Sequence, residues 1–321
     1  MHNSLSKLDW HILGSLEIDS RQSMSSIAKK LKTSKEVINY HVRKLVEEKY
    51  IIRFFAEINL AKLGMQVYKI YFRFQNVTDQ REEEMYKYFT EELKIPWVAS
   101  CSGSYDMIIS FGAKDINDFN EYLTKIMNRF SEYILNREIS TTLYFSTFNR
   151  KWLNKSQDVK CTTVGGDIEI PKLDLKDYAI LANLSNDSRI NIVDLAKKTK
   201  MTSAAIIYRI NSMKEKRIIN AYRIGLDYKR FNKEFCKCFI YLKNNTTEKE
   251  RKLLKYIEQL PEIYTIIKCV GSWDIELEFT VDNFTQFHSI MRDLKNKFDI
   301  IRGYESVIIS QEYGINYYNF I

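Results

Sequence analysis

The 321-residue sequence contains little proline and little glycine, three and ten residues respectively. This scarcity argues against long disordered or low-complexity tracts, which are usually rich in both. No segment approaches the ~20 consecutive apolar residues that a membrane-spanning helix needs. The first residues lack the charged and then apolar pattern of a secretory signal peptide. We therefore expect folded domains and no membrane partner.

Cysteine and histidine are also sparse, with five and four residues. An odd number of cysteines in a long chain is typical of a reducing compartment, so we expect a cytoplasmic protein. Cys236 and Cys238 fall on one face of an alternating apolar stretch, where core packing explains them better than metal binding. The histidines are scattered, without the spacing of a metal site. The sequence predicts no metal and no other cofactor.

The sequence does have enough apolar material for several cores and a surplus of positive charge. Hydrophobic residues make up 45% of the chain and aromatic residues 13%, and the length suggests two to four domains. The formal net charge is +8 at pH 7. This excess permits a polyanionic partner such as nucleic acid without establishing one.

The chain contains one pattern twice, at a constant offset of 168 residues (177 − 9). With Asp9 placed on Asp177, the alignment runs without a gap as far as Leu60 on Tyr228. Identical pieces include Asp-Ser-Arg at 19–21 and 187–189, and Ala-Lys-Lys at 28–30 and 196–198. The offset persists beyond this region, so we expect a tandem duplication of a complete unit.

Each copy opens with three stretches of apolar residues at helical spacing, followed by an extended stretch. In the first copy, Thr33-Ser34 supplies the N-cap of the third helix. Three short helices and a strand, with a polar and basic third helix, are typical of a winged helix-turn-helix, for which double-stranded DNA is the first partner to consider. The expected helices are 8–17, 24–31 and 35–49, then 176–184, 192–199 and 203–216, and the expected wings are 51–60 and 218–228.

The second part of each copy changes to a period of two, which indicates half-buried strands. The order βαββαβ predicts a ferredoxin-like domain, with an antiparallel sheet and helices on one face. The fold class is therefore α+β, with two winged helix-turn-helix domains alternating with two ferredoxin-like domains. The predicted domains are 1–62, 63–153, 173–230 and 231–321, with a linker at 154–172 that contains Gly165-Gly166 and Pro171.

The third helix of each copy carries the candidate DNA-binding residues, because its N-terminal half reads base edges while flanking basic groups bind phosphates. These residues are Ser34, Lys35, Asn39, Tyr40, Arg43 and Lys44 in the first copy, and Thr202, Ser203, Tyr208, Arg209 and Asn211 in the second. The third helix of the second copy is expected to recognise bases less well, since Ala204, Ala205 and Ile207 occupy its first turns. The competing interpretation is a solvated helix face in a winged helix that binds protein.

Together these motifs resemble the Lrp/AsnC family of bacterial and archaeal transcription factors, also called feast/famine regulators. The shared features are Asp-x-x-Ile-Leu, Asp-Ser-Arg, Ala-Lys-Lys, a third helix that starts at Ser or Thr, and Gly-x-x-Asp after the second strand of βαββαβ. The resemblance covers nearly the whole chain twice, whereas the usual family chain holds one unit. It implies a sequence-specific DNA-binding regulator, not an enzyme, that responds to an amino acid or another small effector.

The resemblance also implies effector binding near the Gly-x-x-Asp turn. The corresponding residues are Gly103, Ser104, Tyr105 and Asp106 in the first copy, and Gly271, Ser272, Trp273 and Asp274 in the second. Glycine allows close backbone approach, Asp can hold an ammonium group, and free N–H groups can hold a carboxylate. A plain tight turn whose Asp bonds to backbone is the competing interpretation. The family pairs its sheets face to face, which one chain could do internally as a pseudo-dimer, or two chains could do as a homodimer.

Two other functions fit the same fold. Siroheme decarboxylases resemble it and occur as fused pairs, but they carry His and Arg around the second and third strands, where residues 97–105 of this chain have neither. A tetrapyrrole with many carboxylates would need cationic partners there. The other alternative is an effector-sensing interaction module without DNA binding, which the apolar third helix of the second copy supports. Such a module would show no salt-dependent DNA affinity.

Overall fold

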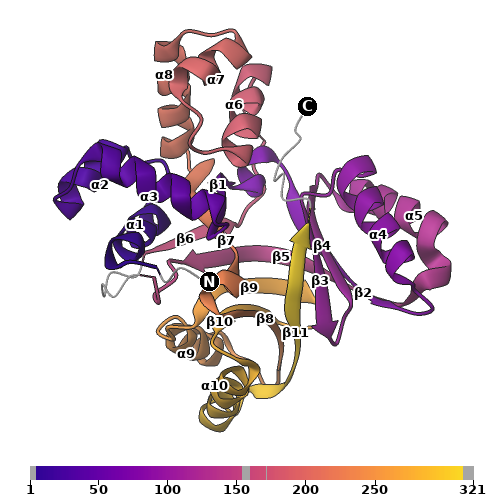
Figure 1. The fold of residues 1–321 in the computed structure, drawn as a ribbon. Helices are drawn as coiled ribbons and strands as arrows, with labels where there is room; N and C mark the ends of the chain where they lie inside the picture. Colours follow the sequence, from indigo (N-terminus) through magenta and orange to yellow (C-terminus); the bar gives the residue numbers. More distant parts are fainter. Residues whose placement is uncertain (1–4, 154–159, 171, 314–321) are drawn as a thin grey trace.

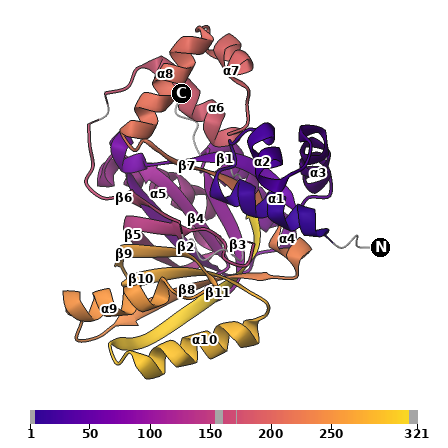
Figure 2. The same cartoon turned by 90° about the vertical axis from the view of Figure 1, so that its left-hand side faces the viewer.

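The computed structural model describes residues 5–153, 160–170 and 172–313. Two three-helix heads lie over a large β-structure, and further helices cover the outer faces of that structure (Figure 1). In the view of Figure 2 both heads lie on one side of the strands, opposite α9 and α10. The arrangement confirms the predicted α+β class and the two winged helix-turn-helix regions.

The first head consists of α1 (Lys7–Ile18), α2 (Met24–Leu31) and α3 (Lys35–Glu47). Ser6 caps α1, because its Oγ accepts a hydrogen bond from the Asp9 N–H (3.1 Å) while the Asp9 carboxylate accepts one from the Ser6 N–H (2.8 Å). This reciprocal capping box satisfies backbone donors that a helix start leaves without a partner. Ser23 and Ser34 cap the next two helices through their hydroxyl groups.

The second head consists of α6 (Leu175–Asn186), α7 (Ile192–Thr199) and α8 (Ser203–Glu215). It repeats the local chemistry of the first at the offset of 168 residues. Asp174 and Asp177 form the capping box of α6, as Ser6 and Asp9 do in α1. The residue that ends α7, Lys200, has the same left-handed φ of 53° as Lys32 at the end of α2. The predicted repeat is therefore confirmed at the level of helix caps.

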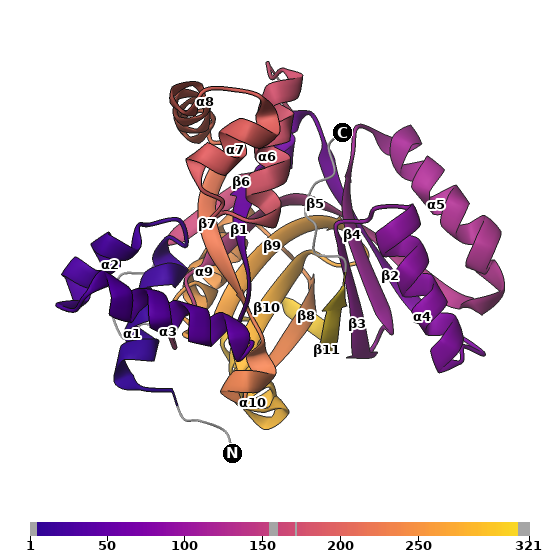
Figure 3. The same ribbon diagram turned by 45° about the horizontal axis from the view of Figure 1, so that its top comes forward.

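The two extended stretches that were expected as wings pair with each other. β1 (Ile51–Ile58) and β7 (Ile219–Leu226) form a two-stranded antiparallel ribbon that runs between the heads (Figure 3). Each strand also completes the core of the other copy's head, since Ile224 packs among the first-head helices and Ile58 among the second-head helices. The stretches predicted as wings are therefore strands, and their pairing with each other is a feature that the sequence did not predict.

Each copy then forms a ferredoxin-like sheet, with strand orders β3-β4-β2-β5 and β11-β8-β10-β9. Apolar side chains on one face of each sheet pack under its two helices. The first domain is β2 (Gln66–Phe74), α4 (Asp79–Lys87) with η2 (Tyr88–Glu92), β3 (Trp97–Gly103), β4 (Met107–Ala113), α5 (Ile116–Phe130) and β5 (Ile134–Phe148). The second is β8 (Glu234–Leu242), α9 (Thr247–Ile257), β9 (Ile263–Gly271), β10 (Ile275–Val281), α10 (Phe284–Lys297) and β11 (Ile301–Tyr313). Short helices η1 (Leu60–Leu63), η3 (Ser131–Tyr133) and η4 (Tyr228–Phe231) connect elements.

The two sheets join edge to edge at both sides. β3 pairs with β11 and β5 pairs with β9, both antiparallel, so eight strands close into one continuous circuit. The helix pairs α4/α5 and α9/α10 lie on its outside (Figure 1). Closure pairs the sheet edges that would otherwise be templates for another chain. The faces of the two sheets that lack helices now enclose a common interior.

Part of the segment that was predicted as a linker forms regular structure. Residues 161–165 form β6 (Cys161–Gly165), which pairs with β5, so this part of the prediction is wrong. The Glu169 N–H then donates to the Ala61 carbonyl (2.9 Å), which holds the segment along η1. Residues 154–159 and Pro171 of the predicted linker lie outside the described residues.

No helix in the described ranges is long and apolar enough to cross a membrane. Within the same ranges, His, Cys, Asp and Glu side chains form no group of three or more placed to hold a metal ion.

Candidate nucleic-acid interface and interdomain sites

The helix α3 presents a polar face to solvent. Its buried stripe is Ile38, Val42 and Leu45, which fixes the opposite side outward. Asn39 and Arg43 are exposed, and the Tyr40 side chain keeps 55% of its surface accessible. The remaining predicted residues of this helix also lie at the surface, with Ser34 as the N-cap, Lys35 exposed and Lys44 half-buried.

The helix α8 presents a more apolar face. Thr202 is its N-cap, and Ser203 and Asn211 are exposed. Tyr208 is 75% exposed and Ile207 48% exposed. Because Ile207 stands where α3 has Asn39, α8 lacks a side chain able to read a base edge at that position. The structure therefore brings nearly all predicted DNA-facing residues to the surface, but the two helices differ in chemistry.

Arg209 differs from the other predicted residues because it is engaged within its own head. Its guanidinium donates to Asp174 (2.9 Å) and Asp177 (2.8 Å) at the start of α6. The equivalent residue of the first copy, His41, contacts Asp9 through Nδ1 at 2.7 Å. A residue at this position therefore ties the third helix to the first in both copies. DNA contact by Arg209 stays a prediction.

The heads meet across a pseudo-twofold relation that the sequence reasoning missed. The Ser20 and Ser188 hydroxyls lie 2.8 Å apart and are both buried. Arg21 donates to the carbonyls of Ser188 and Ile190, and Arg189 donates to those of Ser20 (2.5 Å) and Gln22. The identical Asp-Ser-Arg tripeptides were the available signal, since a sequence repeated at a helix end can make a contact between the copies as well as end the helix.

The glycines of the two predicted effector turns lie where the sheets join. Gly103 faces Val307 of β11, and Gly271 faces Ser140 of β5. A Cβ on Gly103 would lie 2.5 Å from the Ser306 carbonyl oxygen, and one on Gly271 equally close to that of Ile139. Glycine is required because backbone from the other copy approaches this closely.

The other residues of these turns also have structural partners. The Asp106 carboxylate accepts from the Phe74 N–H, and the Asp274 carboxylate from the Leu242 N–H, both at 2.7 Å. Tyr105 and Trp273 are buried between the sheets. Ser104 is half-buried and Ser272 is exposed, and Gly271 and Ser272 line a shallow depression beside residues 134–139. Effector binding here stays a prediction, and the contacts of both carboxylates support the competing interpretation of a structural turn.

The interior between the sheets holds a buried network of charge. The Glu276 carboxylate contacts Lys69 (2.7 Å) and Lys237 (3.0 Å) and accepts from the Tyr71 hydroxyl. Lys237 also pairs with Glu278 at 2.8 Å. Burial alone would raise the pKa of Glu276, but Lys237 and Lys69 outweigh it and hold that pKa well below its ordinary value. Burial lowers the pKa of Lys69, although Glu276 partly offsets the effect.

This network breaks the symmetry of the repeat. Lys69 and Lys237 occupy equivalent positions (237 − 69 = 168). Glu276 and Glu278 have Ile108 and Ser110 as their equivalents, so only the second copy supplies carboxylates. Two copies of the first sheet would bring two lysines together without a carboxylate between them, at a large desolvation cost. The two sheets are therefore complementary rather than identical partners.

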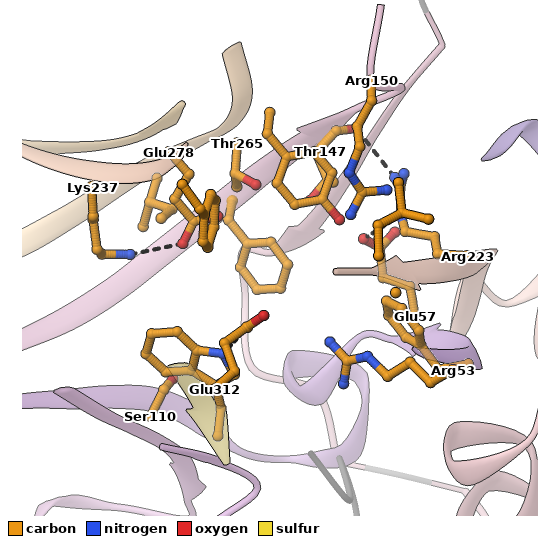
Figure 4. Close-up of a pocket in the computed structure, with 18 of the residues that line it drawn as sticks. Arg53, Glu57, Ser110, Thr147, Arg150, Arg223, Lys237, Thr265, Glu278 and Glu312 are labelled. Atoms are coloured by element: carbon orange, nitrogen blue, oxygen red, sulfur yellow. Dashed lines mark hydrogen bonds and ion pairs between the residues drawn. The ribbon is translucent and has the colours of Figure 1, made fainter. Parts of the chain in front are cut away.

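A cavity of about 170 Å³ lies where the barrel interior meets the ribbon (Figure 4). Its walls come from β1 and β7 on one side and from all eight barrel strands on the other. Two arginines at its rim are buried in ion pairs, Arg150 with Glu17 (2.7 Å) and Arg223 with Glu57 (3.0 Å). The prediction of site residues included none of these groups, because no motif marks them.

Known proteins are similar to this chain in both helical heads and over one repeat unit. The winged helix-turn-helix DNA-binding family model matches residues 5–52 and 173–220. An uncharacterized HTH-type transcriptional regulator of Pyrococcus horikoshii is 29% identical over 133 residues, covering 41% of this chain and 86% of the relative. The proline dehydrogenase transcriptional activator of Rhizobium radiobacter is 30% identical over 124 residues, covering 38% of this chain and 78% of the relative. These relatives are each about one repeat long.

A solved structure matches the chain over nearly all of its length. The crystal structure of the siroheme decarboxylase NirDL superposes with a TM-score of 0.62 over 95% of this chain and 92% of that chain, at 11% identity. At that identity the likeness shows a shared fold.

Proposed function

The chain belongs to the Lrp/AsnC family of helix-turn-helix transcriptional regulators, and from this premise we propose that one chain presents both recognition helices, α3 and α8, to one DNA duplex. The observation that carries the proposal is the head-to-head contact between Ser20 and Ser188. It fixes two recognition helices at one separation within a single chain. In DNA-binding dimers of this type, that separation sets the spacing of the two half-sites.

Within this arrangement α3 recognises the base sequence more specifically than α8. Asn39 and Tyr40 supply hydrogen-bonding groups toward bases, while Arg43 and Lys44 supply phosphate contacts. The α8 face offers Thr202, Ser203, Tyr208 and Asn211 around an exposed Ile207. An apolar side chain can contact a thymine methyl but discriminates less than a paired hydrogen bond. We expect two half-sites of unequal information content.

The test is selection of bound duplexes from a random library, followed by fluorescence anisotropy on the selected sequence. Asn39→Ala should relax preference in one half-site only, and Tyr208→Ala should affect the other half-site weakly. Arg43→Ala with Lys44→Ala should weaken binding to all sequences alike and reduce the dependence on salt. Lys252→Ala, on the outer helix α9, is the matched control. Equal binding by all variants would overturn the assignment of α3.

We further propose that the chain acts as a covalent pseudo-dimer. The closed strand circuit already pairs β3 with β11 and β5 with β9 inside one chain. The complementary charges of the two sheets favour this pairing over the pairing of like sheets from two chains. Light scattering should then give the mass of one chain, 38.2 kDa, at micromolar concentration.

The decarboxylase alternative has the whole-chain likeness to NirDL in its favour. Against it stands the size of the interior cavity, about 170 Å³, below the roughly 300–1,000 Å³ of sites for drug-sized ligands. A tetrapyrrole is larger than most such ligands, and none of the histidines in the described ranges lines this cavity. Addition of siroheme to the purified protein should leave the siroheme absorption spectrum unchanged, and a spectral shift would favour the enzyme.

A further inference from the structure

The segment 146–153 joins the first head to the barrel. It covers the last residues of β5 and those that follow, and its Leu153 is buried in the core of the first head. The Trp152 ring lies 6.3 Å from that of Trp10 on α1, and its indole N–H donates to the Thr280 hydroxyl of β10 at 2.9 Å. One short segment therefore contacts a head and the barrel together.

Arg150 makes the main polar contact of this segment. Its guanidinium lies 2.7 Å from the carboxylate of Glu17 near the end of α1, and both side chains are buried. The same carboxylate accepts from the Arg150 backbone N–H at 2.9 Å. Removal of either partner would leave an uncompensated buried charge. The two positions can therefore lose their charges only together.

The repeat places a second copy of this segment at 314–321 (314 − 146 = 168). These residues lie outside the described residues, the last of which is Tyr313 of β11. The final two positions of the segment are an aromatic and an aliphatic residue in both copies, Trp152-Leu153 and Phe320-Ile321. In Figure 1 β11 runs toward the side of the barrel on which the heads lie. The second segment therefore starts from the equivalent place with the same length of chain.

The second head has an apolar site that corresponds to the site of Trp152. Trp152 packs against Trp10 and against Phe231 of η4, whose ring centre lies 5.1 Å from its own. The equivalents of these two partners at the offset of 168 residues are Tyr178 of α6 and Leu63 of η1. Leu63 belongs to the apolar core of the second head, and Tyr178 packs against that core. An aromatic side chain at position 320 would meet the same kind of surface.

The hydrogen bond of the first segment is changed on both sides in the second copy. The indole N–H of Trp152 donates to Thr280. Their equivalents are Phe320, whose ring has no N–H group, and Gly112, which has no hydroxyl. A change on one side alone would have left a buried polar group without a partner. The loss of donor and acceptor together indicates that these two positions are in contact in the second copy as well.

The ion pair is changed in the same way. Arg150 and Glu17 correspond to Tyr318 and Ser185, so the second copy has neither charge. Ser185 is only 1% exposed, and an unpaired arginine beside it would be costly. A tyrosine, with one hydroxyl and no charge, suits a position next to a buried serine. Two independent contacts of the first segment therefore have matched replacements in the second.

We propose that residues 314–321 hold the second head to the barrel as residues 146–153 hold the first. Phe320 packs against Tyr178, and Tyr318 takes the position that the buried arginine has in the first copy. The occupant of this surface is a segment of the same chain, because it continues β11 directly and carries the matched replacements. The two heads are thus attached by equivalent segments of different strength, one with a buried ion pair and one without.

The difference between the segments has a consequence for DNA binding. Deletion of residues 314–321 should loosen the second head and leave the contacts of the first head in place. Affinity for the half-site bound by α8 should then fall more than affinity for the half-site bound by α3. This consequence rests on the function proposed above, whereas the contact itself does not.

The direct test is a cross-link between two introduced cysteines in the full chain without DNA. Cys161→Ser first removes the exposed native thiol, since the other four native cysteines are buried. Tyr178→Cys combined with Phe320→Cys is then treated with a short bis-maleimide, and the product is identified by mass. We expect a cross-link within one chain, at the 38.2 kDa mass of the single chain plus the reagent.

Two cysteine pairs in the same background serve as controls. Trp10→Cys with Trp152→Cys should cross-link, because these rings are in contact in the first copy. Tyr208→Cys with Phe320→Cys should not, because Tyr208 is 75% exposed on α8. A product that holds two chains, no product at positions 178 and 320, or an equal yield at positions 208 and 320 would each overturn the proposal.

A second test transfers the ion pair of the first copy to the second. Ser185→Glu alone buries an unpaired carboxylate and should lower the thermal midpoint by roughly 5 °C or more. Addition of Tyr318→Arg should recover at least half of that loss, because the two groups would form the contact that Arg150 and Glu17 form. Asn319→Arg, which adds the same charge one residue further along, is the matched control. No recovery with Tyr318→Arg, or equal recovery with Asn319→Arg, would overturn the proposal, and the cross-link decides if Ser185→Glu fails to fold.

Discussion

Ser20 and Ser188 place their hydroxyl oxygens 2.8 Å apart, although 168 residues separate them in the sequence. Each is the middle residue of an Asp-Ser-Arg tripeptide, and each tripeptide sends its arginine to backbone carbonyls of the other copy. The contact is therefore made by equivalent residues on both sides, as in a twofold dimer. It turns two separate helical heads into one unit with a fixed spacing between α3 and α8.

We predict that Arg21→Met combined with Arg189→Met loosens this unit. Each guanidinium donates charge-assisted hydrogen bonds to half-buried carbonyls, worth about 1–3 kcal/mol per side. The free energy of unfolding, from urea denaturation, should fall by that order. Affinity for a two-half-site duplex should fall more than affinity for one half-site. Lys198→Met, exposed on α7, is the control. An unchanged ratio of the two affinities would mean that the contact between the two tripeptides does not set the spacing between α3 and α8.

Arg209→Met should lower the stability of the protein more than it lowers the affinity for DNA. Its guanidinium bridges Asp174 and Asp177, and its side chain is 27% exposed, so its removal should cost about 1 kcal/mol of unfolding free energy. DNA affinity should change less than in Arg43→Met, whose side chain is 70% exposed. A larger loss of DNA affinity in Arg209→Met than in Arg43→Met, with unchanged stability, would contradict this assignment.

The turn glycines test whether the Gly-x-x-Asp segments are structural. Gly103→Ala and Gly271→Ala would each push a methyl group to 2.5 Å from a carbonyl oxygen of the other copy. The added methyl group should force the paired strands apart and lower the free energy of unfolding by about 1–3 kcal/mol in each variant. Gly303→Ala, with no atom within 4 Å of the added Cβ, should be near neutral. Equal thermal midpoints for all three variants would show that the sheets do not meet as described.

Glu276→Gln should be the most destabilising single substitution within the barrel. It leaves Lys69 and Lys237 buried with one carboxylate, Glu278, between them. Removal of one partner from a buried ion pair typically costs 3–5 kcal/mol. Urea denaturation measures the loss. Glu305→Gln, whose carboxylate is only partly buried against Tyr241, should lose much less.

The same carboxylate sets an acid dependence of stability. The folded-state pKa of Glu276 lies below its ordinary value of 4.5, so its contribution is fully present above pH 4.5 and is lost as pH falls through the lowered pKa. The unmodified chain should therefore lose stability on acidification below about pH 4.5 more steeply than Glu276→Gln. Thermal midpoints of both proteins between pH 3 and pH 7 provide the comparison (~0.5 pH steps suffice). Parallel curves would assign the acid dependence to other carboxylates.

Sequence reasoning predicted the elements well because their signals are local. Ser34, predicted as the N-cap of the third helix, caps α3, and Thr202 caps the equivalent helix α8. Strand alternation and the offset of 168 residues predicted two ferredoxin-like domains in the observed order. The Gly-x-x-Asp turns were also located correctly. Their glycines, however, serve the closure of the barrel, which depends on an approach between chain segments that no local pattern reveals.

The pairing between copies could not be derived in the same way. A strand such as β1 has the same sequence pattern whether it forms a wing of its own or pairs with β7, since both arrangements bury one apolar face. Glu276 is a single acidic residue in a strand, and only its position between Lys69 and Lys237 gives it a role. Arg53 and Glu312 lie 259 residues apart (312 − 53), and both line one cavity only because the ribbon lies against the closed barrel.

The most direct test of the account is the stoichiometry of the DNA complex. Light scattering coupled to size-exclusion chromatography should be run on the full chain, alone and with a duplex selected for tight binding. We predict one chain of 38.2 kDa when free and one chain per duplex when bound, with affinity that falls steeply as salt rises. A complex that holds two chains per duplex, or an absence of binding at low salt, would contradict it.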